Sequence, residues 1–371
     1  MKEINISRII TDNRRAKGIT QEQLAVYMGV SKASVSKWET GQSYPDITFL
    51  PQLAAYFNIT IDELMGYEPQ MTKEDIKALY HRLSADFANK PFSGVLDECR
   101  KIIRKYYSCF PLLMQMAVLL CNHHTLAEEA EEKKRILEET AELCERIKTE
   151  SGDPWLTRDA ASLEGVCCLM MNKPQEVLDL LGETIRPISN DEAGIAQAYL
   201  MLGNLSGANR VLQISMYQHL LVLAASGCSM LQLQNEQFEE TLRRLLSLAE
   251  IFDLERLHPN TMALIYLNGA QGFCMKGDHE KALDMLQRYA VLCTTVFFPC
   301  TLHGDVFFYE LDGWFEEFDL GKEAVRSDEL IKKSMIESIA LNPAFEGLKQ
   351  DPKYKNIIAI LETGLEQTST S

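Results

Sequence analysis

The stretch that decides the fold runs from Thr20 to Gly41 and reads TQEQLAVYMGVSKASVSKWETG. Its pattern predicts two short helices joined by a tight turn. Thr20 followed three residues later by Gln23 is the arrangement that satisfies the free N–H groups at a helix start. Gly29 is expected to end the first helix and Ser31 to cap the second. Because only about three residues connect the helices, the stretch predicts a helix-turn-helix.

The second of these helices divides into two faces when its residues are placed at about 100° per position. Val35 and Trp38 fall on the face expected to be buried. The opposite face carries Lys32, Ala33, Ser36 and Lys37. Such a small, basic and hydrogen-bonding surface is typical of a helix that enters the major groove of DNA.

These residues closely resemble the Xre-type helix-turn-helix of lambdoid phage repressors and many bacterial regulators. The resemblance covers roughly residues 4–66, with turn, cap, core and recognition positions in register. It rests on Gln21, Leu24, Ala25, Gly29, Val30, Ser31, Val35, Ser36, Trp38, Glu39, Gly41 and Pro45. The alternative is a helical hairpin that only packs a protein core.

The resemblance also implies roles for individual side chains. Base edges would be contacted by Lys32, Ala33, Ser36 and Lys37. Phosphates would be contacted by Gln21 and Ser34, aided by the helix N-terminus. Arg14 and Glu39 would form a structural ion pair between the first and third helices, with a phosphate contact for Arg14 as the alternative.

Charge is unevenly distributed along the 371 residues, whose net charge is −16. Residues 1–70 contain seven Lys and Arg against eight Asp and Glu, whereas the remaining residues contain 30 against 45. The acidic part should stay off the phosphates, so affinity for double-stranded DNA must come from a local basic face. Because that face is modest, we expect a homodimer on a palindromic operator, with half-sites about 10 to 10.5 bp apart or a multiple of that distance.

Composition favours a soluble cytoplasmic protein. Ten scattered cysteines fit a reducing compartment better than a disulfide framework. The apolar run FPLLMQMAVLLC at 110–121 is broken by Gln115 and is shorter than the roughly 18 residues of a membrane span. The start MKEINIS lacks the pattern of a secretory signal. We therefore predict no membrane association.

The predicted fold class is all-α. Residues 1–67 should form a five-helix lambda-repressor-like domain around Leu24, Val35, Trp38, Leu53 and Leu64, and residues 68–72 should form a linker. Residues 73–371 show helical periodicity and no long strand pattern.

A repeated spacing of five positions supports a helical array in the second domain. Small residues mostly occupy the first and fourth positions, and the third should turn the chain between two helices. Four copies are Gly165, Cys168, Asn172, Val177 and Leu181; Ala196, Tyr199, Gly203, Ala208 and Leu212; Ser229, Gln232, Glu236, Thr241 and Leu245; and Ala270, Phe273, Gly277, Ala282 and Leu286. The pattern resembles the tetratricopeptide repeat, which implies an α-solenoid closed by the C-terminal helices.

The inner surface of such an array is the predicted ligand groove. Its candidate residues are Tyr199, Asn204, Tyr266, Asn268 and Gln271. Amide and hydroxyl side chains of this kind hold an extended peptide through its backbone. The alternative is that they are ordinary solvated or interhelical residues.

No motif for catalysis, a metal or a cofactor stands out, and we predict a non-enzyme. There is no Gly-rich phosphate loop, G-x-S-x-G or H-E-x-x-H. Cys121, His123 and His124 suggest a metal site, but a helix end with a polar tip is the alternative. Cys167 and Cys168 suggest redox chemistry, and core packing is the alternative.

The order of domains resembles the peptide-responsive transcription regulators of Gram-positive bacteria. This architecture implies a dimeric DNA-binding regulator whose array binds a short peptide or a small molecule. A rival interpretation is an interaction module, in which the array grips a partner protein and the helix-turn-helix only localises it.

Overall fold

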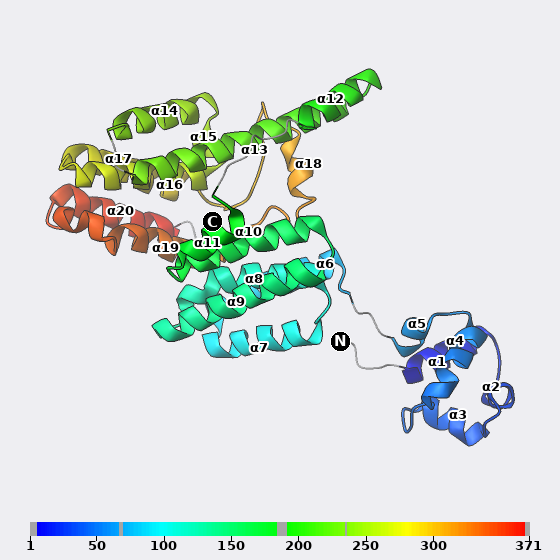
Figure 1. Cartoon of the computed structure of the whole chain (residues 1–371). Helices are drawn as coiled ribbons and strands as arrows, with labels where there is room; N and C mark the ends of the chain where they lie inside the picture. The colour runs from blue at the N-terminus through cyan, green and yellow to red at the C-terminus, as the bar shows by residue number, and fades with distance from the viewer. Residues whose placement is uncertain (1–5, 67–69, 184–190, 234–235, 368–371) are drawn as a thin grey trace. The chain divides into compact units, whose positions relative to one another are not determined.

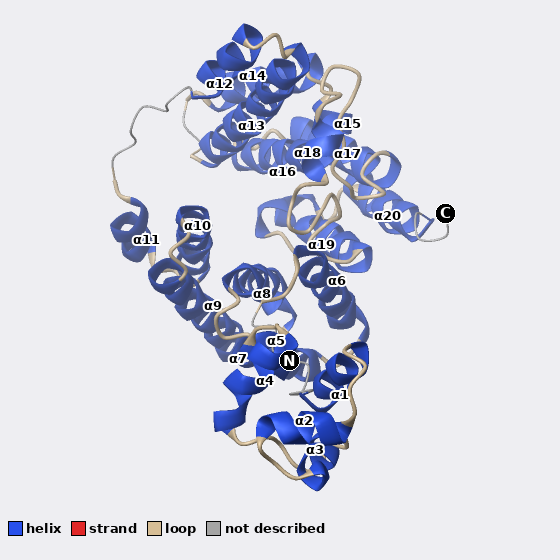
Figure 2. Cartoon of the chain, turned by 90° about the vertical axis from the view of Figure 1, so that its right-hand side faces the viewer, coloured by secondary structure: helices blue, strands red, loops and turns tan. Residues whose placement is uncertain are grey.

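The computed structural model describes residues 6–66, 70–183, 191–233 and 236–367, which form helices and connecting loops (Figures 1 and 2). In these ranges the only β-type pairing is an isolated antiparallel bridge between Thr301 and Glu323. The all-α prediction is therefore confirmed. The chain divides into two compact units, residues 1–76 with 92–181 and residues 77–91 with 182–371, which are described separately below.

The N-terminal domain contains five α-helices and one short 3-10 helix. They are α1 (Ile6–Ala16), α2 (Gln21–Met28), α3 (Lys32–Glu39), η1 (Ile47–Phe49), α4 (Leu50–Phe57) and α5 (Ile61–Met65). Thr20 and Gln23 form the expected reciprocal cap on α2, and Ser31 caps α3. Gly29 lies between them in the left-handed conformation, with φ of 68°. The predicted turn at Gly29 and the predicted caps at Thr20 and Ser31 are thus confirmed.

One hydrophobic cluster closes this domain. Its fully or nearly fully buried members include Ile10, Leu24, Val35, Leu53 and Leu64. They come from α1, α2, α3, α4 and α5, so each helix contributes to one core. Burial of these apolar side chains stabilises a domain of only about sixty residues. Residues 68 and 69 of the predicted linker lie outside the described residues. The linker ends at Thr72, whose hydroxyl oxygen accepts the Asp75 N–H at the start of α6.

The rest of the first unit consists of helices that follow one another as antiparallel neighbours. They are α7 (Phe92–Lys105), α8 (Phe110–His123), η2 (His124–Leu126), α9 (Ala130–Glu150), α10 (Pro154–Met170) and α11 (Pro174–Leu181). Helices α8, α9 and α10 pack against one another. Cys121, Leu137 and Cys167 are buried together at this packing site. No side chain of α11 is buried.

The second unit begins with α6 (Lys73–Asn89), most of which belongs to it, and continues after residue 190. Its remaining helices are α12 (Asp191–Met201), α13 (Leu205–Gln232), α14 (Phe238–Ile251), α15 (Leu254–Leu257), α16 (Pro259–Met275), α17 (His279–Thr295), α18 (Leu311–Phe315), α19 (Asp328–Ala340), η3 (Pro343–Leu348) and α20 (Pro352–Gln367). One large cluster runs from Tyr217 on α13 to Leu365 on α20. Helix α20 packs against α17, as expected of closing helices.

All four predicted repeat copies fall on helix–turn–helix pairs in the same register. The pairs are α10 with α11, α12 with α13, α13 with α14, and α16 with α17. In three copies the third position has positive φ: 58° at Asn172, 74° at Gly203 and 77° at Gly277. Residues able to adopt this conformation are needed where the first helix stops. The helical hairpins are therefore confirmed, although two copies share α13 rather than having separate helices, and their stacking into one tetratricopeptide-like solenoid stays a prediction.

Helix α13 is longer than the repeat predicts because no proline interrupts its 28 residues. By length and composition alone it is apolar enough to cross a membrane, which the sequence pattern did not predict. It packs against α12, α14, α16 and α18, and 33% of its apolar window is buried. Gln213, which is buried, accepts the Glu310 backbone N–H at 3.0 Å.

Candidate functional site

Helix α3 is held by its apolar face. The Val35 side chain is fully buried, and Trp38 is nearly so. The Trp38 ring lies 5.8 Å from the Phe49 ring, centroid to centroid. Since both anchors lie on one side of α3, the opposite side is fixed toward solvent.

The exposed face of α3 carries the residues predicted to read bases. Lys32, Ala33 and Lys37 are exposed, and Ser36 is half-buried. The Lys32 ammonium lies 3.4 Å from the Glu22 carboxylate, an exposed pair of the kind that contributes about 1 kcal/mol or less. Lys37 makes no ion pair with any residue in the described part of the chain. Two cations on α3 thus remain available to an anionic partner.

The two residues predicted to contact phosphate are engaged within the domain. Gln21 Nε2 donates to Glu39 Oε2 at 2.8 Å. The Ser34 hydroxyl lies 2.8 Å from the Ser31 hydroxyl, and the Ser34 N–H donates to the same Ser31 oxygen at 3.1 Å. These bonds place both side chains at the N-terminal ends of α2 and α3. Their contacts with phosphate stay a prediction.

Arg14 joins α1 to α3. Its Nη2 donates to Glu39 Oε2 at 3.1 Å, and its Nη1 donates to the Ile19 carbonyl oxygen at 2.7 Å. Both side chains of the pair are largely buried. Burial by itself would raise the pKa of Glu39, but hydrogen bonds from Arg14 and Gln21 and nearby positive charge hold that pKa below its ordinary value. The guanidinium is therefore occupied inside the domain.

The five groove candidates do not share one environment. Tyr266 and Asn268 are buried on α16, where Tyr266 bonds Glu255 and Asn268 donates to the Leu264 carbonyl oxygen at 2.9 Å. Asn204 caps α13 by accepting the Gly207 N–H at 2.9 Å. Tyr199 on α12 and Gln271 on α16 are half-buried. Tyr266 and Asn268 thus have the interhelical surroundings of the alternative interpretation.

The cysteine and histidine pairs are enclosed by helix packing. A hydrogen bond with Cys121 and burial raise the pKa of Cys167, and burial together with Glu176 raises that of Cys168. His123 and His124 each direct Nδ1 at a backbone carbonyl, of Leu119 at 2.8 Å and of Cys121 at 2.7 Å. In the described part of the chain, no three metal-binding side chains cluster.

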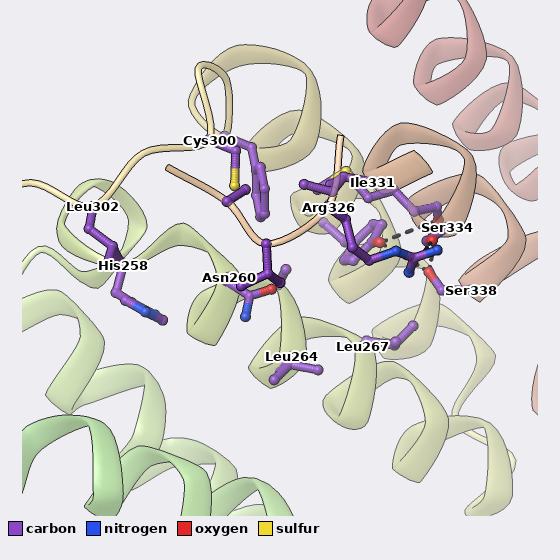
Figure 3. A pocket seen from close by; sticks show the side chains of 16 residues that line it. His258, Asn260, Leu264, Leu267, Cys300, Leu302, Arg326, Ile331, Ser334 and Ser338 are labelled. Atoms are coloured by element: carbon purple, nitrogen blue, oxygen red, sulfur yellow. Dashed lines mark hydrogen bonds between the residues drawn. The ribbon is translucent and has the colours of Figure 1, made fainter. Parts of the chain in front are cut away.

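A cavity that the sequence did not predict lies in the second unit (Figure 3). Its lining residues come from α16, α17, α19 and two loops, at positions from His258 to Ser338. Arg326 is its one strongly basic side chain. No motif surrounds Arg326 in the sequence EAVRSD, so only the fold brings these residues together.

Comparison with known proteins matches residues 10–64 to a helix-turn-helix family. Over 74 residues the chain is 38% identical to the HTH-type transcriptional activator BcrR of Enterococcus faecalis, covering 18% of this chain and 36% of that one. Over 67 residues it is 40% identical to the HTH-type transcriptional regulator SlrR of Bacillus subtilis (strain 168), covering 18% and 44%. The chain thus spans less than half the length of either relative.

Among solved structures, the apo form of the competence regulator ComR from Streptococcus vestibularis aligns with 79% of this chain and 93% of its own. Its sequence identity is 13% and its TM-score is 0.27. The family match at residues 10–64 lies in the N-terminal domain, which carries the capped helices and the exposed α3 face. Residues 10–64 are therefore an Xre-type helix-turn-helix domain of the kind found in bacterial transcriptional regulators.

Proposed function

We propose that this protein is a sequence-specific, DNA-binding transcriptional regulator of the cytoplasm. The observation that carries the proposal is the fixed orientation of α3. Val35 and Trp38 are buried, so Lys32, Ala33 and Lys37 face solvent together. A helix presented in this way fits the major groove, where lysine reads guanine and a methyl group contacts thymine.

The distribution of charge supports a dimer on DNA. The N-terminal domain is close to neutral, and most of the net charge of −16 lies in the array. One α3 helix offers few cations, and each phosphate contact adds only part of the affinity. Two copies on a palindromic operator would double that set. We therefore propose a homodimer, with Gln21 and Ser34 reaching phosphates once bound.

The array is proposed to sense a peptide or a small molecule. Its second unit contains a cavity of about 460 Å³, a size typical of small-molecule sites. A further cavity of about 500 Å³ lies between α13 and α14, where Met230 and Leu245 are among its lining residues. The residues that line both cavities lie far from α3 in the sequence. A signal bound in either cavity would therefore not be part of the DNA-contacting face.

The test is selection of bound sequences from a random pool of double-stranded DNA, followed by affinity against salt for the selected sites. A palindromic motif and a steep fall of affinity with salt would support the dimeric regulator, because released counterions report phosphate contacts. Sedimentation of the protein–DNA complex gives the number of chains per site. Weak binding with no enriched motif would contradict the proposal.

One observation favours the rival function, a module that binds a partner protein. Large apolar side chains are exposed at the end of α12, in the turn that follows and at the start of α13: Met201 and Leu202 are 80% exposed, and Leu205 is 71% exposed. Such groups of exposed apolar residues mark protein interaction surfaces. A Leu202→Glu variant that loses a captured partner but keeps DNA affinity would favour this module. Loss of both would indicate that the partner is a second copy needed on DNA.

A further inference from the structure

The cavity of the second unit has mostly apolar walls. Leu264 and Leu267 come from α16, Phe297 from the loop after α17, and Ile331 and Met335 from α19. Its volume is about 460 Å³. Apolar walls with few polar groups are what small-molecule sites usually present. The polar groups therefore decide what chemistry the cavity accepts.

Arg326 is an incompletely satisfied cation in this apolar setting. Its Nη1 donates to the Ser334 hydroxyl at 3.2 Å, while its Nε is buried and has no hydrogen-bond partner. No carboxylate of a described residue lies within 4.0 Å of the guanidinium. The negative charge of Glu337 favours the charged form of Arg326, but the Glu337 carboxylate pairs with the Lys333 ammonium at 3.8 Å. Arg326 is half-buried, and since an arginine stays charged in proteins, this partial burial without a counter-ion is unfavourable.

Four of the other polar side chains around the cavity, those of Tyr289, Ser334, Ser338 and His258, are already bonded within the protein. The Tyr289 hydroxyl lies 3.0 Å from the Ser338 hydroxyl, and the Ser334 hydroxyl donates to the Leu330 carbonyl oxygen at 2.7 Å. His258 Nδ1 accepts from the Thr261 hydroxyl at 2.8 Å, and burial lowers the His258 pKa. In Figure 3, Arg326, Ser334 and Ser338 lie together on one side of the cavity, away from His258. The unmet requirement is thus an anion on the Arg326 side.

We propose that this cavity is a binding site for a small organic acid, whose carboxylate pairs with Arg326 and whose apolar body lies against Leu264, Leu267 and Ile331. The planar guanidinium matches a carboxylate with two parallel hydrogen bonds. The apolar walls exclude a free inorganic anion, which would lose its hydration without gaining packing. The site is distinct from the predicted peptide groove, since none of the five groove candidates lines it.

The wall that carries Arg326 is also bonded to α6, the helix that follows the DNA-binding domain in the chain. The Val325 carbonyl oxygen accepts from the Tyr80 hydroxyl at 3.0 Å and from the Ser84 hydroxyl at 3.1 Å. Lys77 pairs with Glu323 at 3.3 Å. A bound acid that forms a hydrogen bond with Arg326 would change the position of this segment and, through these bonds, that of α6. A link to regulation rests on the proposed function: the segment would couple the ligand to α6, which follows the DNA-binding domain in the chain.

The experiment is titration calorimetry of the full chain, without DNA, with octanoate and 3-phenylpropionate as probes. Octylamine and 1-octanol serve as probes with a matched apolar body and no negative charge. We expect saturable binding of at least one acid, at least tenfold tighter than the alcohol, and no binding of the amine. Arg326→Met should weaken acid binding at least tenfold, whereas Arg256→Met, at an exposed arginine, should leave it unchanged.

Two results would overturn the inference: failure of both acids to bind, or equal binding of octanoate and 1-octanol. The second comparison uses the unaltered protein, so it decides even where Arg326→Met fails to fold. Hydrogen exchange with and without octanoate then locates the site. Slower exchange is expected in residues 324–335 and in α6, and protection elsewhere alone would contradict it. Because no step uses DNA, this outcome is independent of whether the chain is a regulator.

Discussion

The N-terminal domain and the repeat array differ in how completely they bury their apolar side chains. Each helix of the domain adds to one cluster within about sixty residues. In the array, by contrast, α11 has no buried side chain, and α12 has only Ala196. Caps and turns define the domain locally, whereas a repeat hairpin depends on neighbouring hairpins for its core. Stability should therefore be concentrated in the domain and around α8, α16 and α17, the array helices with the most buried side chains.

The largest expected effect is at the centre of the domain. Trp38→Ala should reduce the free energy of unfolding by about 3 to 5 kcal/mol, because it removes a buried ring and leaves a cavity. Hydrogen exchange in α4 and α5 measures the change. The control is Trp155→Ala on α10, whose side chain is 74% exposed and whose loss should matter by less than about 0.5 kcal/mol. Equal effects of the two variants would contradict the comparison.

A second pair of variants applies the comparison within the array, at the same repeat position. Leu286 on α17 is fully buried, whereas Leu212 on α13 is 42% exposed. Leu286→Ala should cost about 2 to 5 kcal/mol in urea unfolding of the full chain. Leu212→Ala should cost clearly less, since less of its side chain leaves water on folding. Similar costs would mean that the hairpin of α12 and α13 is as well packed as that of α16 and α17.

The link between α1 and α3 gives a smaller, pH-dependent effect. Glu39→Gln should destabilise the domain by about 1.5 to 3 kcal/mol at neutral pH, because it removes charged hydrogen bonds to Arg14. The folded-state pKa of Glu39 is lowered, so its contribution is complete above the ordinary glutamate pKa of about 4.3 and is lost as pH falls through the folded value. Unfolding of both proteins across acid pH checks this. A difference that grows on acidification would contradict the assigned direction.

On DNA, Lys37→Ala should weaken binding to the selected operator by about 1 to 3 kcal/mol and blur preference at one base pair. Competition between operator variants measures this. Lys353→Ala, an exposed array lysine, is the control and should leave affinity unchanged. An equal loss on every sequence would move Lys37 from base reading to phosphate contact.

The smallest effect concerns thiol chemistry in the array. Burial raises the pKa of Cys144 to about 12, and a hydrogen bond with Cys121 and burial raise that of Cys167. Neither should react with a thiol reagent at neutral pH until the chain unfolds. Half-buried Cys274 and Cys300 should be labelled earlier, as peptide mass mapping would show. Rapid labelling of native Cys167 would favour the redox alternative.

Features that depend on neighbours in sequence were the ones predicted correctly. Thr20, Gly29 and Ser31 act through bonds within a few residues, and Asn172, Gly203 and Gly277 turn the chain as the repeat pattern predicts. The continuous α13 was not predicted, because a repeat of helical hairpins implies separate helices in successive copies.

Features that depend on distant neighbours were not predicted. Tyr266 and Asn268 resemble groove residues in sequence, but α15, α13 and α16 supply their partners. The sequence around Arg326 did not indicate a binding site, because the residues that surround its side chain come from α16, α17 and α19. Helical periodicity predicts which face of a helix is apolar, but it does not say which residue from elsewhere meets it.

The absence of buried side chains on α11 has a consequence for the lifetime of the chain in a cell. Leu178 and Leu181 are 43% and 55% exposed, so unfolding of Pro174–Leu181 releases little packing energy. Proteases cut where a segment opens at low cost, well before the whole protein unfolds. Turnover would then be governed by this eight-residue helix rather than by the well-packed N-terminal domain. A partner that covers α11 would raise the abundance of the protein without changing its affinity for DNA.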